Sequence, residues 1–201
     1  MVERPIFIVT YDIKKPVEIK NIEFNWIKGI SYSQKCKRRD EFHKEIQKKY
    51  DINRVLEVST KSNKDIGIKL SAFNLKFKYK DNIKSVEEIY QSSKIIDNNS
   101  IIGFKYEDIF FENEPKGMFY DWLYISALKQ NEEYLNQLEE YEVFTDIEFN
   151  PKRSYNCQAR AVAIYKTLYQ RRVLDEYLSD INKFKEYYKE TFKGDNQLSL
   201  F

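Results

Sequence analysis

One carboxylate in this sequence stands where a helix would present it for chemistry. Ser85 and Glu88 have the Ser-x-x-Glu spacing of a capping box ahead of an apolar run, which predicts a helix capped by Ser85 with Glu87 at its second position. The helix dipole favours the ionised form of a carboxylate in a first turn. Gln91 and Lys94 follow on the same helical face. Glu87 is therefore a candidate base or nucleophile, although most first-turn glutamates do no chemistry.

Length and composition predict one soluble domain. The chain has 201 residues, of which 42% are hydrophobic, including 14 Phe and 16 Tyr, enough for a substantial core. We expect a domain over residues 1–193 and a tail over 194–201. No stretch reaches the roughly 18 apolar residues of a membrane helix, and the first residues do not resemble a signal peptide.

Cysteine and histidine usage adds a prediction about location and metals. Cys36 and Cys157 cannot form a disulfide framework, which suits a reducing cytoplasm. A single histidine, His43, and the lack of a Cys-x-x-Cys motif argue against a zinc site. We therefore expect a cytoplasmic protein with no metal, no cofactor and no membrane contact.

Charge is unevenly distributed although the net charge is only +2. Residues 35–49 hold seven Lys or Arg against three acids, and residues 107–148 are acidic. A local basic stripe can contact a nucleic-acid backbone even on a nearly neutral protein. On charge alone, a solvated helix surface is the favoured interpretation of this stripe.

Patterning predicts an α+β fold dominated by helices, with a few short strands near the N-terminus. Strands are expected at residues 4–10, 19–26, 55–59 and 74–80. Helices are expected at residues 36–50, 61–70, 85–97, 117–129, 132–141, 155–170 and 174–192. The expected buried stripe of the helix over 85–97 is Val86, Ile89, Ser93 and Ile96. Trp122 and Tyr124 alternate with apolar neighbours and are expected in the core.

Short motifs along the chain resemble one enzyme superfamily. The segments 70–75 (LSAFNL) and 85–94 (SVEEIYQSSK) resemble the NADAR (YbiA-like) superfamily, in which a Ser-Asn-Phe-type motif precedes a Glu that opens a helix ending in Gln-x-x-Lys. The whole chain is more narrowly similar to NADAR antitoxins found beside DarT-type DNA ADP-ribosyltransferase toxins. Six segments in order carry this closer similarity: RPIF (4–7), SYSQK (31–35), LEVSTKS (56–62), FYDWLY (119–124), FTDIEFNP (144–151) and NCQAR (156–160).

The resemblance implies a single NADAR/YbiA-like domain that hydrolyses an N-glycosidic bond to ribose. Distant relatives act on amino-pyrimidine intermediates of the riboflavin pathway, whereas the toxin-associated branch removes ADP-ribose from guanine bases in DNA, here expected to be single-stranded. Two departures fit the toxin-associated branch better. Ala72 replaces the Asn of the Ser-Asn-Phe motif, and Glu88 replaces a His that often follows the catalytic Glu.

The resemblance also implies roles for individual residues. Glu87 is expected to be the catalytic carboxylate, assisted by Asp146 and Glu148, which are equally compatible with helix capping or solvated loop charge. Cations are needed for the diphosphate of ADP-ribose. The residues expected to bind ADP-ribose or the base are Lys35, Lys61, Phe73, Asn74, Gln91, Lys94, Asn156, Gln158 and Arg160, with Lys35, Lys61 and Arg160 as the phosphate candidates.

The last five residues match the peptide motif with which bacterial replication and repair proteins dock on the DNA sliding clamp. In this interpretation Gln197, Leu198, Leu200 and Phe201 fill pockets on the clamp. The alternative is an apolar tail that folds back on its own domain. Docking would bring the protein to single-stranded DNA at replication sites.

Two other function classes remain open at this stage. One is a small-molecule N-glycosidase acting on phosphoribosyl amines, which needs neither a basic stripe nor a clamp motif. The other is a binding module that neutralises a DarT-type toxin by contact alone. Charge reversal in the stripe at 35–49 would separate the first of these from a DNA-directed enzyme.

Overall fold

The computed structural model describes residues 1–193, and its largest sheet gathers segments that are far apart in the chain. This four-stranded sheet has the order β2-β1-β9-β3. Its strands are β1 (Val2–Val9), β2 (Val17–Phe24), β3 (Val55–Glu57) and β9 (Val143–Thr145). β1 pairs antiparallel with β2 and β9, and β9 pairs parallel with β3. The parallel pair places the residues that follow β3 beside those that follow β9.

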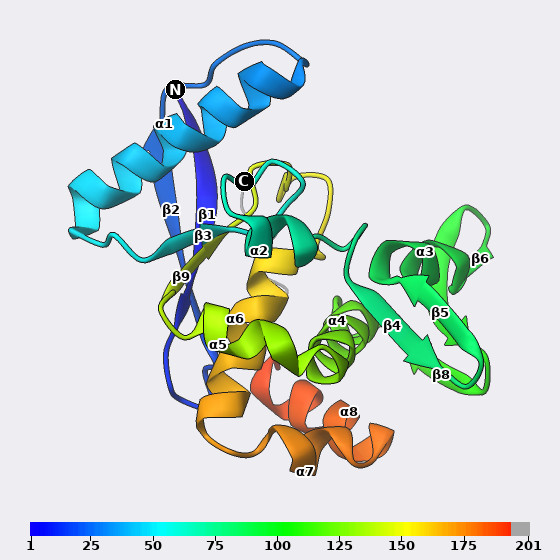
Figure 1. Cartoon of the computed structure of the whole chain (residues 1–201). Helices are drawn as coiled ribbons and strands as arrows, with labels where there is room; N and C mark the ends of the chain where they lie inside the picture. The colour runs from blue at the N-terminus through cyan, green and yellow to red at the C-terminus, as the bar shows by residue number, and fades with distance from the viewer. Residues whose placement is uncertain (194–201) are drawn as a thin grey trace.

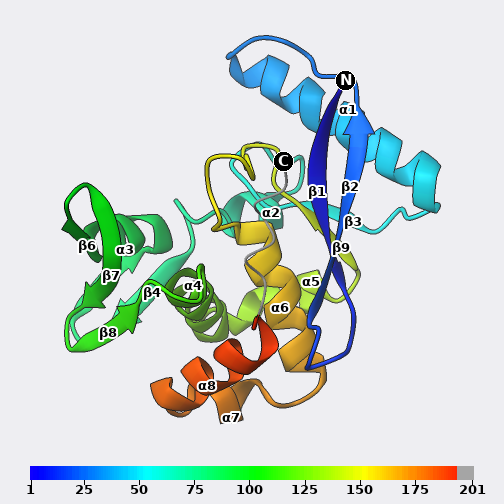
Figure 2. The ribbon, with the colours of Figure 1, turned by 180° about the vertical axis from the view of Figure 1, so that it is seen from behind.

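The two faces of this sheet are covered by different helices, α1 (Tyr32–Tyr50) and α6 (Gln158–Gln170). Successive strand residues point to opposite faces. Ile6 accordingly packs in one buried cluster with Phe42 of α1, whereas Phe7 packs in a second cluster with α6. Figure 1 shows α1 lying across β1 and β2, and Figure 2 shows the same sheet from behind.

A second part of the structure lies on the far side of helix α4 (Met118–Gln130) from the large sheet (Figures 1 and 2). It contains helix α3 (Val86–Ser92), a two-stranded sheet and a three-stranded sheet. The strands are β4 (Lys76–Tyr79), β5 (Asn82–Ser85), β6 (Lys94–Asp97), β7 (Ser100–Tyr106) and β8 (Ile109–Glu112). The remaining helices are α2 (Asp65–Lys69), a 3-10 turn (Glu132–Tyr134), α5 (Leu135–Leu138), α7 (Leu174–Leu178) and α8 (Ile181–Thr191).

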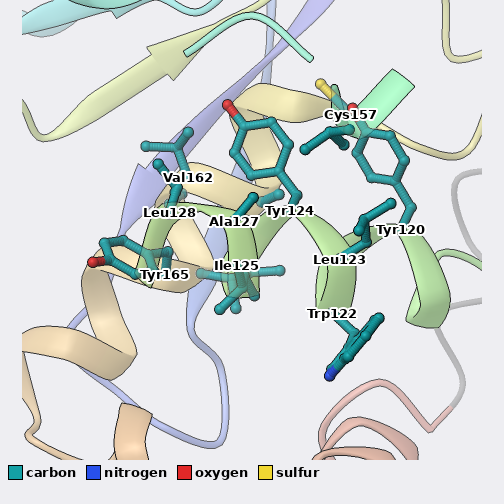
Figure 3. Packing of buried hydrophobic residues seen from close by; sticks show 14 of the residues in the cluster. Tyr120, Trp122, Leu123, Tyr124, Ile125, Ala127, Leu128, Cys157, Val162 and Tyr165 are labelled. Atoms are coloured by element: carbon teal, nitrogen blue, oxygen red, sulfur yellow. The ribbon is translucent and has the colours of Figure 1, made fainter. Parts of the chain in front are cut away.

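Helix α4 is buried on nearly every side and joins the two parts. Figure 3 shows Tyr120 and Tyr124 projecting toward Cys157, with Trp122 on the opposite side of the helix. Trp122 and Tyr124 are both buried, so the prediction that they belong to the core is confirmed. The hydroxyl of Tyr124 donates to the carbonyl of Leu70 and so ties α4 to the segment before β4.

The predicted fold class is correct only in its mixture of helices and strands. Helices make up 41% and strands 23%, so the predicted dominance of helices is only loosely supported. The strands expected near the N-terminus are present as β1, β2 and β3, but five more lie between residues 76 and 112, so strands are not confined to that region. The helix predicted over 85–97 ends at Ser92, and the chain continues as β6. Ile96, expected in the buried stripe, is 64% exposed.

Three other helices differ from prediction at their ends. α2 starts at Asp65, after Lys64, which provides no side-chain cap, rather than at residue 61. The helix expected over 132–141 is a 3-10 turn and the short α5. The helix expected over 174–192 is interrupted before Ile181, where the side chain of Asp180 caps α8.

Two further predictions concern the tail and a membrane-spanning helix. The tail over 194–201, with its proposed clamp motif, lies outside the described residues. Within residues 1–193, no helix is both long enough and apolar enough to cross a membrane.

Candidate functional site

A cleft of about 790 Å³ lies where the start of α1, helix α3 and the loop from β9 to α6 meet. Eight of the residues predicted to act on or bind the substrate line it. They are Lys35, Phe73, Glu87, Gln91, Asp146, Glu148, Asn156 and Gln158. These residues come from four separate segments of the chain, so the fold itself brings them together.

The backbone around Glu87 is fixed by local sequence. Ser85 Oγ accepts from the amide of Glu88 (3.2 Å) and the Glu88 carboxylate accepts from the amide of Ser85 (2.7 Å), so the predicted capping box is present. The first amides of a helix lack partners within the helix. Here the amide of Val86 donates to Leu75 O (3.0 Å) and that of Glu87 to Ala72 O (2.9 Å).

Apolar burial holds the same helix in place. Val86 and Ile89, which belong to α3, are completely buried. Burying each side chain contributes about 1.5–3 kcal/mol. The side chain of Glu87 lies on the other face, half-buried in the cleft wall. Glu87 Oε1 accepts from Gln91 Nε2 at 2.7 Å, and Gln91 Oε1 accepts from Lys94 Nζ at 2.5 Å. Lys94 does not line the cleft, and it contacts Glu87 only through Gln91.

Gln158 connects the loop beneath Glu87 to Asp146. Its Oε1 accepts from the amide of Ala72 at 2.7 Å, and its Nε2 donates to Asp146 Oδ2 at 3.0 Å. The other oxygen of Asp146 accepts from the amide of Glu148 at 3.0 Å. Since Ala72 O accepts from the amide of Glu87, one chain of hydrogen bonds runs from Glu87 to Glu148.

Asp146 is a carboxyl group in a poorly solvated position, 9% exposed at the wall of the cleft. Burial raises its pKa well above the usual range, and the nearby carboxylate of Glu57 raises it further. Hydrogen bonds from the amide of Glu148 and from Gln158 oppose this shift without reversing it. A carboxyl group of this kind keeps its proton to a higher pH than an ordinary aspartate does.

Glu57, which the sequence analysis did not identify, is completely buried below Asp146. It accepts from Ser59 Oγ (2.6 Å), Thr145 Oγ1 (2.6 Å) and the amide of Ile147 (2.8 Å). Burial acts to raise its pKa, but His43, at 3.9 Å, and the two hydroxyls together lower it below the usual value. The parallel pairing of β3 with β9, which sequence spacing could not show, brings Glu57 beside this loop.

Two tyrosines and an asparagine also line the cleft beside Glu87. Asn156 Nδ2 donates to Tyr90 OH at 2.5 Å, and Asn156 Oδ1 is buried with no hydrogen-bond partner within residues 1–193. Burial and then the charge of Glu87 raise the pKa of Tyr90. Burial raises the pKa of Tyr120 well above its usual range, and charges that include those of Asp146 and Glu87 add to this effect. Both phenols therefore stay neutral at physiological pH.

The cations of the cleft differ from those predicted. Lys35 lines it, but its ammonium is 2.7 Å from Glu148 Oε2. Arg4, Lys28, Arg38 and Arg153 also line it, and the sequence analysis assigned none of them to the site. Two signals for Arg4 and Arg38 existed: Arg4 belongs to a resemblance motif, and Arg38 to the basic stripe. Within residues 1–193, no group of His, Cys, Asp or Glu side chains is arranged to hold a metal ion.

Besides Lys94, three residues expected to bind substrate do not line the cleft. Arg160 is 2% exposed and forms a buried ion pair with Asp121. Asn74 Nδ2 donates to the carbonyl of Ile68 at 2.8 Å and closes the turn before β4. Lys61 lies over the ring of Tyr32 at 5.3 Å. Each of these three side chains has another contact in the structure, so their assignment to substrate stays a prediction.

The basic stripe at 35–49 is partly neutralised within α1. Lys48 pairs with Glu45 at 2.6 Å and Lys44 with Glu41 at 4.0 Å, while Arg38 and Arg39 are buried. Exposed pairs of this kind contribute little to stability, but they reduce the free positive charge. The stripe is therefore a weaker signal for DNA than its composition suggests.

The chain matches the sequence profile of one family, described as DarT1-associated NADAR antitoxin. The match covers residues 2–100 and 95–197, which is nearly the whole sequence. No curated protein is similar enough to be matched.

Proposed function

Because the chain belongs to the DarT1-associated NADAR antitoxin family, we propose that it hydrolyses the N-glycosidic bond joining ADP-ribose to guanine in DNA. Antitoxin function is the role that the family description states, and NADAR proteins are generally glycohydrolases. The observation that carries the proposal is the pair of unlike carboxyl groups in one cleft, half-buried Glu87 and buried Asp146.

Cleavage of a ribosyl C–N bond passes through a transition state with positive charge at the anomeric carbon. A carboxylate close to that carbon stabilises this charge. In the proposed reaction Glu87 has this role and accepts a proton from the attacking water. The water oxygen bonds to the anomeric carbon as the C–N bond breaks, and the bonding electron pair stays on the guanine nitrogen.

The departing nitrogen needs a proton, and Asp146 is the group we assign to supply it. Its raised pKa keeps it protonated at a pH where an ordinary aspartate is ionised. After the proton transfer, the amide of Glu148 and the side chain of Gln158 hydrogen-bond the aspartate anion. A proton passing from Glu87 through solvent to Asp146 restores the starting state.

Other lining groups suit the remainder of the substrate. The unpartnered Asn156 Oδ1 can accept from a ribose hydroxyl or a guanine N–H group. Phe73 is 64% exposed at the cleft, where a base could stack on its ring. Glu148 and Lys35, already paired with each other, can exchange this pair for contacts to substrate.

The direct test is release of ADP-ribose from a guanine-modified single-stranded oligonucleotide. Glu87→Gln should remove activity, whereas Glu88→Gln is a matched control, because glutamine at this position still completes a capping box. Glu87→Gln turning over at the wild-type rate would exclude the proposed role of Glu87.

Two comparisons separate the alternative functions. A small-molecule N-glycosidase would act on ADP-ribosyl-guanosine as well as on the modified oligonucleotide, and charge reversal at Lys37 and Lys44 would leave both rates unchanged. If the protein acts by contact alone, the Glu87→Gln variant would still protect cells from the toxin. Our proposal predicts loss of protection in that variant.

A further inference from the structure

Two arginines that line the cleft lie against the same aromatic ring. The guanidinium carbon of Arg38 is 3.8 Å from the centre of the Trp26 ring, and that of Arg4 is 5.0 Å from it. All three residues line the cleft. Arg4 comes from β1, Trp26 follows β2, and Arg38 comes from α1, so the arrangement depends on how sheet and helix pack.

Backbone contacts fix the orientation of both guanidinium groups. Arg38 Nε and Nη2 donate to the carbonyl of Ile27 at 3.0 and 2.7 Å, and Nη2 also donates to that of Gly29 at 2.8 Å. Arg4 Nη1 donates to the carbonyl of Glu3 at 3.0 Å. Arg4 Nε is buried and has no hydrogen-bond partner within residues 1–193.

Neither arginine forms an ion pair with an acid within residues 1–193. The ammonium of Lys35, by contrast, is already compensated by Glu148 at 2.7 Å. Burial lowers the pKa of Arg4, and the positive charge of Arg38 lowers it further. Burial also lowers the pKa of Arg38, an effect that the charge of Glu148 opposes. Two partly desolvated like charges without an acid partner destabilise this region, and a bound anion would relieve the repulsion.

We propose that Arg4 and Arg38, both held against the ring of Trp26, form a binding site for a phosphate-ester anion. Guanidinium N–H donors match phosphate oxygens. Within residues 1–193, Nη1 of Arg38 and the Nε and Nη2 groups of Arg4 are not used in other hydrogen bonds. This inference rests on the proposed function, because ADP-ribosylated DNA carries such anions in the diphosphate of ADP-ribose and in the DNA backbone. Arg4 and Arg38 line the cleft, whereas Lys61 and Arg160, the phosphate candidates from sequence, do not.

Binding measurements without turnover test the site. The probes are inorganic pyrophosphate, ADP-ribose and an unmodified single-stranded oligonucleotide, each titrated calorimetrically into the full chain. Arg4→Gln should weaken binding of at least one probe about tenfold or more, which is the loss expected for a charge-assisted contact. Arg4→Lys should recover only part of the affinity, because lysine keeps the charge without the paired donors.

Lys183→Gln is the control for the loss of one charge, because Lys183 is exposed on α8, outside the cleft. Tryptophan fluorescence adds a local readout. A phosphate probe should change the wild-type emission and leave Trp26→Phe unchanged, since Trp122 is buried in the core. Circular dichroism checks that every variant is folded.

The pattern across probes identifies the source of the phosphate. If Arg4→Gln weakens binding of pyrophosphate and ADP-ribose, the site binds the diphosphate. If the substitution weakens binding of the oligonucleotide alone, the site binds the DNA backbone. The proposal is overturned if the wild type binds no probe, or if Arg4→Gln binds each as tightly as Lys183→Gln does. Arg4-dependent binding in a protein that releases no ADP-ribose from modified DNA would refute the proposed hydrolysis and leave the phosphate site standing.

Discussion

Gln158 is the residue whose replacement tests the architecture of the cleft most clearly. Its side-chain oxygen accepts from the buried amide of Ala72, and its nitrogen donates to the buried Oδ2 of Asp146. Gln158→Met keeps a side chain of similar length and removes both hydrogen bonds. Two buried polar groups then lose their partners, at a cost of about 1–3 kcal/mol each.

The expected loss in the free energy of unfolding is therefore about 2–6 kcal/mol, or about 4–24 °C in Tm for a domain of this size. Urea unfolding followed by circular dichroism measures it. Gln91→Met is the matched control: Gln91 is exposed, so the same substitution there should change stability by about 0.5 kcal/mol or less.

Activity should fall with the same substitution. Ala72 O accepts from the amide of Glu87, so a shift of the loop at Ala72 moves the carboxylate. We expect a lower kcat for Gln158→Met in the fraction of protein that remains folded. If Gln158→Met and Gln91→Met are equally stable, the hydrogen bonds of Gln158 do not hold the cleft together, and the argument from them is refuted.

Three further predictions concern charge and the tail. The lowered pKa of Glu57 means that its carboxylate stabilises the fold at neutral pH and that this contribution is lost as pH falls through the lowered value. Glu57→Gln should therefore be less stable than wild type at pH 7. Urea unfolding at pH 7 and in acid should show that the free energy of unfolding falls less on acidification in the variant than in the wild type. The raised pKa of Asp146 has the opposite sign, so its contribution to the free energy of unfolding falls as pH rises from about 4 through the raised value, and Asp146→Asn should lack that fall. Removal of residues 197–201 should reduce affinity for a purified sliding clamp and leave ADP-ribose release unchanged; equal clamp affinity with and without these residues would exclude the docking motif.

The start of α3 could be predicted from sequence because capping is local. Ser85 and Glu88 satisfy each other, and two buried apolar residues follow at helical spacing. The end of the helix was missed although a signal was present. Asn98 and Asn99 have positive φ angles of 46° and 60°, as a tight hairpin turn requires, and asparagine tolerates this conformation well. They join β6 to β7 where a longer helix was expected.

The candidate site could be predicted in part, for a similar reason. Glu87, Asp146 and Gln158 lie in motifs that carry the family resemblance, and they meet in the cleft. Arg160 lies in such a motif too, but its partner Asp121 comes from another helix, and no local pattern shows a buried ion pair. Glu57 lies in the resemblance motif at 56–62 and was not singled out, because only the pairing of β3 with β9 places it beside the residues that precede Asp146.

The central claim is that Glu87 carries out hydrolysis, and a single-turnover rate measures this most directly. Enzyme in excess over an ADP-ribosylated guanine oligonucleotide reports the chemical step, while binding of the same oligonucleotide is measured separately. Our account predicts that Glu87→Gln binds the oligonucleotide like the wild type and releases ADP-ribose at least about 10²–10³-fold more slowly, with Glu88→Gln close to the wild-type rate. A Glu87→Gln rate equal to that of Glu88→Gln would contradict it.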